Sequence, residues 1–400
     1  MSRRLAFALL AMMAGQAVVY IARPATSYRL LGLGEDARAV GLVTAAYALL
    51  PLFLAIPLGR LTDRRPATPL LVGGCGLEVA ACLLLAVART PVGLALASAL
   101  LGLGHLGVAL GAQAVIARES ADESHDRHFG LLTVGVSLGQ LIGPLIAGGV
   151  LSSRDGLTLE AATTRAMFVA AVVALVAAAC AALAEHGRAR AAVPHERPHG
   201  NSWTIVRTRG VAAGIFASIA VLSATDIVTA YLPVLAEEKG IGPGTVGVLL
   251  AVRAAASMAS RLGIGPIVDL VGRLRLIALG AVISAAAFAG LTLTSDPITL
   301  GVLMVVAGLA LGFGQPLSMT LVVQRVPEHA RGTALAVRLA GNRLGQVAAP
   351  AIAGLVAGSA GVASVFWLMG GTLLVSGAAV LRPPPPPARG EVVAAESVVD

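Results

Sequence analysis

Apolar runs of roughly twenty residues recur from one end of this 400-residue chain to the other. As a helix rising about 1.5 Å per residue, each run is long enough to cross a hydrocarbon layer of about 30 Å. Hydrophobic residues make up 57% of the chain and charged residues only 12%, too few to cover a water-soluble surface. We therefore expect an all-α integral membrane protein.

Charges, prolines and glycines separate twelve such runs into two sets of six. The first set covers residues 5–23, 38–59, 70–88, 91–117, 129–152 and 164–185, and the second covers 209–235, 242–263, 274–293, 297–323, 331–357 and 362–381. Two arginines ahead of the first run resemble the start of a signal peptide, but the many further runs favour an uncleaved first helix.

The segments outside these runs define the expected domains. A polar, arginine-rich stretch with Pro194 and Pro198 separates the two sets and has the composition of a linker. The end of the chain begins with five prolines and has too little apolar surface to fold alone. We expect an N-terminal six-helix bundle at 1–185, a linker at 186–208, a C-terminal six-helix bundle at 209–382 and a disordered tail at 383–400.

The distribution of basic residues predicts the orientation in the membrane. With both termini inside, nineteen Lys and Arg residues fall in inner loops and tails and seven at the outer side, while Arg253, Arg338 and Arg343 lie within runs. Cytoplasmic segments carry the excess of basic residues in multi-pass proteins. We expect a cell-membrane protein whose termini and linker face the cytoplasm.

Several classes of function are not indicated. The net charge of +8 is scattered between apolar runs and aromatic residues make up only 4%, so we expect no nucleic-acid partner. Cys75, Cys82 and Cys180 lie within apolar runs without metal-ligand or paired spacing, so no disulfide, metal or other cofactor is predicted. We expect a monomer whose partners are lipid and a small-molecule substrate, with protons as the candidate coupling ion.

An internal repeat is the most informative pattern in the chain. Gly59 and Asp63 recur 206 residues later as Gly265 and Asp269, and Val40-Gly41 recurs as Val246-Gly247. At the same offset, Gly135, Gly139, Gln140, Pro144, Ala147 and Gly148 recur as Gly341, Gly345, Gln346, Pro350, Ala353 and Gly354. One gap-free register therefore links the halves, which indicates duplication of a six-helix unit.

These motifs resemble the major facilitator superfamily over essentially the whole chain. Its hallmark loop between the second and third helices matches Gly59-x-Leu61-x-Asp63-Arg64, with a weaker copy from Gly265 to Arg275. The run from Gly135 to Gly148 is similar to the glycine-proline motif of twelve-helix drug-proton antiporters, with the terminal glycine pair displaced by one residue. The resemblance implies twelve transmembrane helices in two pseudo-symmetric bundles.

The hallmark loop is the candidate cytoplasmic gate. A carboxylate beside a helix N-terminus accepts hydrogen bonds from free backbone N–H groups and offsets the helix dipole. The resemblance implies that Asp63 contacts the start of the eleventh helix, near Gly332 and Thr333; the alternative is a simple cytoplasmic turn. The gate candidates are Gly59, Asp63, Arg64, Asp269 and Arg273.

The glycine-proline motifs are candidate hinges or close-packing surfaces. Glycines four residues apart let helix backbones approach, and a proline removes one helical hydrogen bond. Tight packing without motion remains the alternative for each residue, but the recurrence favours a shared mechanical role. The residues concerned are Gly135, Gly139, Gly143, Pro144, Gly148, Gly345, Pro350 and Gly354.

Polar residues inside the runs are the substrate or coupling candidates, because charges at membrane depth are costly. The set comprises Asp226, Arg253, Arg343, Arg338, His105, Gln113, Gln16 and Gln315. We expect Asp226 to pair with Arg253 or Arg343. His105 is a proton carrier or a hydrogen-bonded packing residue. The resemblance puts Glu78 on an outer helix, where a structural or snorkelling role is expected.

Three functions compete for this chain. Efflux of a drug-like or metabolite compound by proton antiport is favoured by the fifth-run motif, although the fourth run lacks the arginine that such exporters usually carry. Uptake or exchange of a small organic anion is favoured by the membrane arginines. A polytopic membrane enzyme is disfavoured, because no HExxH, GxSxG or paired catalytic carboxylate spacing is present, and no P-loop points to ATP.

Overall fold

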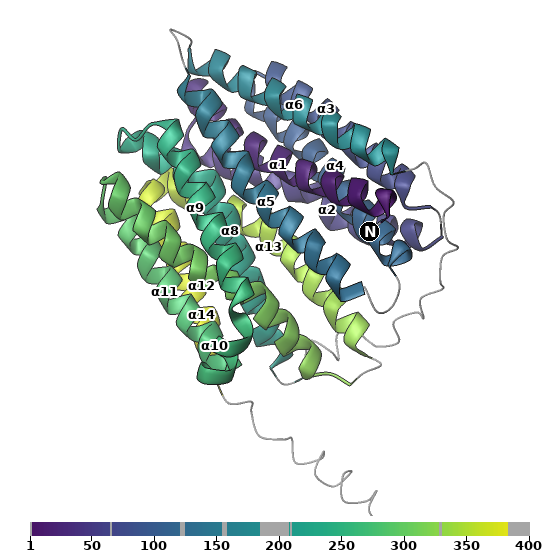
Figure 1. Ribbon diagram of the computed structural model, residues 1–400. Helices are drawn as coiled ribbons and strands as arrows, with labels where there is room; N and C mark the ends of the chain where they lie inside the picture. The colour runs from purple at the N-terminus through teal and green to yellow at the C-terminus, as the bar shows by residue number, and fades with distance from the viewer. Residues whose placement is uncertain are drawn as a thin grey trace, which may run out of the picture.

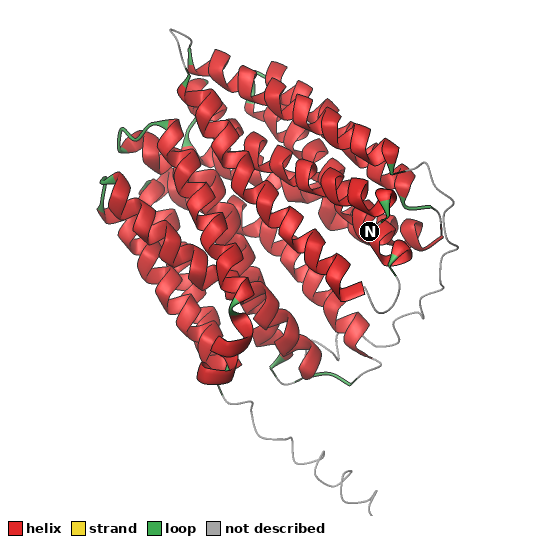
Figure 2. Ribbon diagram, in the orientation of Figure 1, coloured by secondary structure: helices red, strands yellow, loops and turns green. Residues whose placement is uncertain are grey.

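The computed structural model of the protein describes residues 2–64, 66–120, 125–153, 158–184, 208, 210–327 and 330–382. The linker and the tail expected at 186–208 and 383–400 lie almost entirely outside these ranges. Figure 2 shows that the described chain is built of helices joined by short loops. They are α1 (Arg3–Gly32), α2 (Ala37–Arg64), α3 (Thr68–Val87), α4 (Pro91–Glu119), α5 (His125–Ser152), α6 (Leu159–Leu183), α8 (Val211–Glu238), α9 (Pro243–Leu262), α10 (Ile264–Val271), α11 (Arg273–Leu293), α12 (Pro297–Gln324), α13 (Arg331–Ala360) and α14 (Val362–Leu381).

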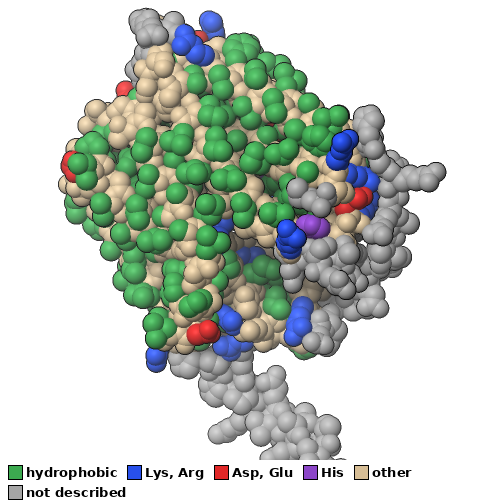
Figure 3. Space-filling model, viewed as in Figure 1, with side chains coloured by type: hydrophobic (Ala, Val, Ile, Leu, Met, Phe, Trp, Pro, Cys, Tyr) green, Lys and Arg blue, Asp and Glu red, His purple; other side chains and the backbone are tan. Residues whose placement is uncertain are grey.

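Eleven of the described helices are long and apolar enough to cross a membrane. The remaining long helix, α13, has 30 residues, but Arg331, Arg338 and Arg343 make it more polar. Figure 3 shows hydrophobic side chains over most of one face of the molecule, with a hollow in which basic side chains are visible. A multi-pass membrane protein follows, and twelve spans remain the prediction.

The long helices form two halves, α1 to α6 and α8 to α14 (Figure 1). We call the end of the bundle where α1 begins and α14 ends the terminal face, and the other end the opposite face. The largest buried apolar cluster joins both halves and includes Leu30, Val40 and Val234 from helix ends near the opposite face. Toward the terminal face the core divides into separate clusters, one confined to the first half and two to the second. The halves are therefore packed together at the opposite face and parted at the terminal face.

Two helix crossings close the opposite face, and the repeat relates them. A Cβ atom added at Gly41 of α2 would collide with the carbonyl oxygen of Pro350 and lie 2.5 Å from Cα of Gly354, both in α13. Each of these three residues has a counterpart 206 positions away in the other crossing. There, a Cβ atom at Gly247 of α9 would collide with the carbonyl oxygen of Pro144 and lie 2.9 Å from Cα of Gly148, both in α5.

The remaining glycines of these motifs pack within their own half. Added Cβ atoms at Gly139 and Gly143 would lie 2.5 Å and 2.8 Å from carbonyl oxygens of α1, and Gly135 faces the same helix. In α13, an added Cβ at Gly345 would lie 2.5 Å from the Ile219 side chain of α8. The stripe on α5 therefore packs on α1 near the terminal face and crosses to the other half near the opposite face.

Helix α1 is longer than predicted. The first span was expected to end at Arg23, where a charge precedes Pro24, but the helix continues to Gly32. Arg23 forms a buried ion pair, described below. Pro24 removes one hydrogen bond of the helix, but the position is buried among neighbouring helices and not exposed to lipid. Arg23 was counted among the outer cations; its side chain is instead only 9% exposed.

A second difference concerns the weaker copy of the hallmark loop, which contains the short helix α10. Its apolar residues Ile264, Ile267, Val268 and Val271 are spaced as one helical face, and they pack against a buried cluster of the second half. Gly272 then takes a left-handed φ of +84° and lets the chain turn into α11. The loop was predicted from its glycines and charges, whereas packing of the apolar residues decides the local structure.

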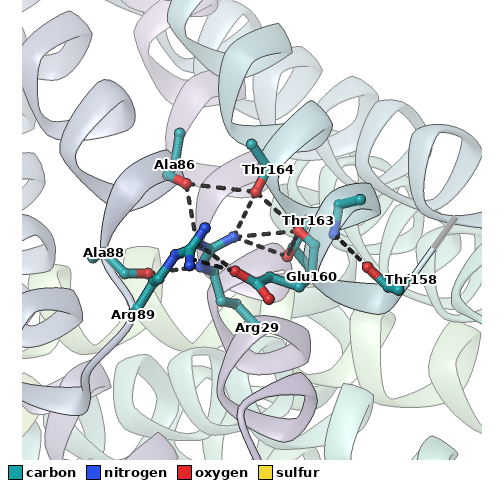
Figure 4. Close-up of polar contacts among 9 residues, drawn as sticks. Arg29, Ala86, Ala88, Arg89, Thr158, Glu160, Thr163 and Thr164 are labelled. Atoms are coloured by element: carbon teal, nitrogen blue, oxygen red, sulfur yellow. Dashed lines mark hydrogen bonds and ion pairs between the residues drawn. The ribbon is translucent and has the colours of Figure 1, made fainter.

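A buried cation fastens α1 to its neighbours at the opposite face (Figure 4). The Arg29 side chain is 1% exposed and donates to the carbonyl oxygens of Ala86 and Ala88 at the end of α3, and to Thr164 of α6. In the second half, Lys239 at the end of α8 donates to Leu291, Thr292 and Thr294 at the end of α11. Thr292 and Thr294 are the repeat counterparts of Ala86 and Ala88, so both halves cap the same helix end with a cation.

Candidate functional site

A central cavity of about 810 Å³, including the space at its mouth, lies between the two halves. It is lined by residues of α1, α2, α4 and α5 from the first half and of α8, α9, α12 and α13 from the second. The lining contains six of the eight predicted substrate or coupling residues, namely Gln16, His105, Asp226, Arg253, Gln315 and Arg343. Gln113 is exposed and Arg338 is buried, and neither lines the cavity.

The cavity also contains polar residues outside the predicted set. These are Tyr20, Arg23, Tyr47, Gln140, Thr225, Ser257, Arg261 and Gln346. Gln140 and Gln346 are repeat counterparts, so the register that links the two halves was a signal for them. Arg23 and Arg261 lie near the ends of their predicted spans and were counted with the loop cations, and only the helix packing reveals that they face the cavity.

An ion pair joins the two halves across this cavity. Arg23 Nη1 of α1 lies 2.5 Å from Asp226 Oδ1 of α8, and both side chains are less than a tenth exposed. The guanidinium carbon of Arg23 lies 5.1 Å from the centre of the Tyr47 ring of α2, a distance that suits a cation–π contact. Asp226 therefore balances a cation of the opposite half.

The remaining Asp226 oxygen is bound through an amide. Gln346 Nε2 donates to Asp226 Oδ2 at 2.9 Å, and Arg343 Nη1 donates to Gln346 Oε1 at 2.9 Å. The expectation that Asp226 pairs directly with Arg253 or Arg343 was therefore wrong. The sequence indicates how deep a residue lies in the membrane, but the rotation of each helix determines which side chains it contacts. Because α1 continues to Gly32, Arg23 lies inside the bundle and contacts Asp226.

Arg253 is the least satisfied group in the cavity. Its side chain is 2% exposed, and its Nε and Nη2 atoms are buried without a hydrogen-bond partner among the described residues. Arg261, about two turns further along α9, also has a buried Nε atom without such a partner. With Arg23 and Arg343, four guanidinium groups line the cavity, against the one carboxylate of Asp226.

Arg338 belongs to a polar network behind the cavity wall. It donates to the Gln315 side-chain oxygen at 2.6 Å and to the Gln315 backbone oxygen at 3.1 Å. Gln315 in turn donates to the backbone of Ser218, and the Ser218 hydroxyl lies within hydrogen-bond distance of Asn342. This network ties α8, α12 and α13 together, so the structure favours a packing role for Arg338.

His105 meets a carboxyl group that was expected to be peripheral. His105 Nδ1 of α4 lies 3.2 Å from Glu78 Oε1 of α3. Glu78 is completely buried, so the snorkelling role expected for it was wrong. The outer position of α3 relative to the cavity does not expose Glu78, because the side chain points inward toward α1 and α4.

The gate candidates are only partly described. The side chains of Asp63 and Arg64, at the end of α2, lie outside the described part of the structure, so their contact with α13 stays a prediction. The Gly59 carbonyl accepts from Thr62 within the same helix turn. Asp269 is exposed on α10, and Arg273 donates to Gln324 of α12. In the described residues, Arg273 therefore fastens α11 to α12.

The arrangement suits binding of a polar solute better than catalysis. The cavity combines cations and amides from both halves with the phenols of Tyr20 and Tyr47 from the first half, and a change in how the halves pack would alter its access. Among the described residues, no group of three or more His, Cys, Asp and Glu side chains is placed to hold a metal ion.

Comparison with known proteins agrees with this architecture. The family model described as Major Facilitator Superfamily matches residues 5–242 and again residues 215–399. A mutant of the nucleoside transporter NupG is similar with a TM-score of 0.80 at 14% identity, covering 95% of this chain and 99% of that chain. No curated protein sequence matches the chain.

Two further solved structures share the fold. A POT family transporter in complex with a thioalcohol-conjugated peptide has a TM-score of 0.76 at 13% identity, covering 94% of this chain and 95% of that chain. A bacterial homologue of the human lysosomal transporter Spinster, in an inward-facing and unoccupied conformation, has a TM-score of 0.67 at 15% identity, with 95% of both chains covered. At these identities the likeness concerns the fold alone.

Proposed function

Because the chain belongs to the major facilitator superfamily and is a transporter, not an enzyme, we propose that it carries a small anionic solute across the membrane by alternating access. The observation that carries this proposal is Arg253, a buried cation in the cavity wall whose Nε and Nη2 atoms have no partner among the described residues. A bound carboxylate or phosphate would accept from both atoms in the paired geometry that guanidinium favours.

The charge balance of the cavity supports an anion over a cation or a neutral compound. Asp226 is already engaged by Arg23 and Gln346, so it has no free oxygen to attract a cationic solute. Arg253, Arg261 and Arg343 remain without a carboxylate among the described residues. An arginine cannot readily lose its proton, and a buried cation without a counter-charge is costly. Entry of an anion would relieve that cost.

Alternating access is supported by how the halves meet. The core is continuous across the halves at the opposite face and divided at the terminal face, so a rocking movement can open one end as it closes the other. The crossings of Gly41 with Pro350 and of Gly247 with Pro144 are the contacts that would part in this movement. If the terminal face is cytoplasmic, as the basic residues predict, the described conformation opens inward.

A second candidate is efflux of a drug-like compound by proton antiport. It is favoured by the glycine-proline stripe of α5, in which Gly139, Pro144 and Gly148 make the close contacts described above. The polar and cationic lining of the cavity supports this candidate less well than transport of an anion. The nucleoside and the peptide named for the structural neighbours belong to those proteins and do not identify the solute of this cavity.

Counterflow separates the two candidates. Purified protein in proteoliposomes would be loaded with each member of a panel of unlabelled organic acids, sugar phosphates and cationic drugs, and entry of the labelled compound would be followed with and without a pH gradient. Uptake stimulated by internal organic acid supports the anion proposal. Exchange of cationic drugs alone, driven by the pH gradient, would instead establish the second candidate.

A further inference from the structure

Glu78 carries a fully buried carboxyl group that does not line the solute cavity. It lies on α3, behind the cavity-lining helices α1 and α4, and none of its side-chain surface is exposed. Oε1 lies 3.2 Å from His105 Nδ1, whereas Oε2 is buried and has no hydrogen-bond partner among the described residues. A carboxylate in this position would have an unsatisfied oxygen in a low-dielectric environment, so protonation is the natural way to neutralise it.

Two glycines, Gly15 of α1 and Gly104 of α4, leave space for this carboxyl group because they have no side chain. A Cβ atom added at Gly15 of α1 would lie 3.1 Å from Glu78 Oε2, and one added at Gly104 of α4 would lie 3.1 Å from Glu78 Cγ. The residues that follow these glycines, Gln16 and His105, line the central cavity. The carboxyl group is therefore separated from the cavity by one helix layer, and His105 contacts both.

Few other titratable groups surround Glu78. From its own helix, Cys75 and Cys82 lie one turn before and after it and interact with it electrostatically. From α4 the group is His105, and from α2 it is the more distant Tyr47. The α1 residue facing the carboxyl group is Gly15, which carries no charge. His105 is thus the group through which a proton can reach Glu78.

From this geometry we propose that Glu78 and His105 form a proton-binding site that loads from the central cavity. A hydronium ion in the cavity protonates His105 Nε2 and leaves water behind. The Nδ1–H bond then breaks as a bond forms between that proton and Glu78 Oε1, so one proton is taken up and the imidazole is again neutral. The inference rests on the proposed transport function in one respect, since it supplies that transport with a coupling ion.

The internal repeat argues against a purely structural pair. The counterparts of Glu78 and His105 at the 206-residue offset are Ser284 of α11 and Leu311 of α12. The second half therefore packs the equivalent helices without an acid or a histidine, and the fold does not need them. A costly buried acid present in only one of two duplicated units indicates a function of that unit.

Infrared spectroscopy of the purified protein in lipid tests the site without any solute, so a failed counterflow panel leaves the result standing. A buried carboxylic acid gives its own C=O stretching band, which we expect to disappear reversibly as the pH is raised and to shift in D₂O. The band should be absent from Glu78→Gln. Because this variant also removes a buried contact, labelling the wild type with carbon-13 glutamate shows independently whether the band belongs to a glutamic acid and not to an aspartic acid.

The role of His105 and a matched control complete the test. In His105→Gln the band should persist to higher pH than in the wild type, since a hydrogen-bond partner of the ionised carboxylate is lost. In Glu119→Gln, which removes a partly exposed carboxylate paired with Arg4, the band should be unchanged. Three results would each overturn the proposal: a band that survives Glu78→Gln, a band that does not titrate while the protein stays folded, or the absence of any carboxylic acid band.

Discussion

Arg23 and Asp226 form an ion pair that joins the two halves of the protein, with 2.5 Å between Nη1 and Oδ1. Arg23 comes from α1 and Asp226 from α8, helices that occupy equivalent places in the two repeats. The pair is buried, and each member is held by a second contact, Arg23 by the Tyr47 ring and Asp226 by Gln346. Any movement of one half against the other must therefore stretch or reorient this pair.

The first prediction concerns the energetics of that pair. Asp226→Asn and Arg23→Gln should each lower stability by about 3–5 kcal/mol, because each leaves the other group buried without its partner. The double variant should lose about 2 kcal/mol less than the sum of the two single losses, because neither group is then left as an unpaired buried charge. Thermal unfolding in detergent measures all three variants.

A second double variant makes the test specific. Arg253→Gln combined with Asp226→Asn should be additive within about 0.5 kcal/mol, because no contact joins the two residues. Arg89→Gln is the exposed control, since its ion pair with Glu160 lies largely in solvent. Additive losses for the Arg23 and Asp226 double variant would show that the pair does not hold the halves together.

The second prediction concerns the crossings at the opposite face. Gly41→Ala and Gly247→Ala should each destabilise the closed opposite face by about 1–3 kcal/mol, because the added methyl group meets a backbone carbonyl that cannot move freely. Gly76→Ala, in the middle of α3 with open space around its Cα, should be neutral or slightly stabilising. Reactivity of a cysteine at Thr225, in the cavity, measures access from the opposite side. Equal access in the crossing variants and in Gly76→Ala would contradict the assignment.

The third prediction concerns the paired cations at the helix ends. Arg29→Met should cost about 2–4 kcal/mol, since it strands the carbonyl oxygens of Ala86 and Ala88 in a buried position. Lys239→Met should cost less, about 1 kcal/mol, because Lys239 is partly exposed. Arg89→Met, which removes an exposed partner of Glu160, should change stability by less than about 0.5 kcal/mol. A loss for Arg29→Met no larger than for Arg89→Met would remove the anchoring role.

The fourth prediction concerns orientation, which the basic residues indicate and no contact in the structure tests. A cysteine placed at Ser202 in the linker should be unreactive toward an impermeant maleimide in intact cells and should react after the membrane is permeabilised. A cysteine at Glu237, exposed near the end of α8, should react from outside. The opposite pattern would invert the topology and make the described conformation open outward.

The sequence alone predicted the helical architecture and the repeat, because apolar runs and a constant offset depend only on local composition and register. It also identified Gly139 and Gly345 as positions of close helix packing, whereas their mechanical role stays a prediction. It did not predict that Pro144 and Pro350 would each meet a glycine of the other half, although Gly41 and Gly247 were already linked by the same offset. Self-similarity relates equivalent positions but does not reveal which of them touch.

The partners of charged residues were the least predictable part of the site. A run of apolar residues fixes roughly how deep a side chain lies, whereas the rotation and tilt of each helix decide what it faces. Arg23 was therefore missed as the partner of Asp226, and Glu78 was placed at the periphery although it is buried against His105. The helix α10 was missed for a related reason, because its eight residues follow a glycine and its apolar face packs on a cluster that includes residues of α11 and α12.

The dependence of organic-acid counterflow on Arg253 tests most directly whether the cavity binds an anionic solute. In proteoliposomes containing equal amounts of folded protein, Arg253→Gln should lose at least about tenfold in exchange rate, equivalent to one charge-assisted hydrogen bond of about 1.4 kcal/mol or more. Arg89→Gln, which changes an exposed arginine outside the cavity, should retain the wild-type rate. Wild-type exchange of organic acids by Arg253→Gln, or wild-type protein that exchanges only cations, would contradict the claim that this cavity binds an anionic solute.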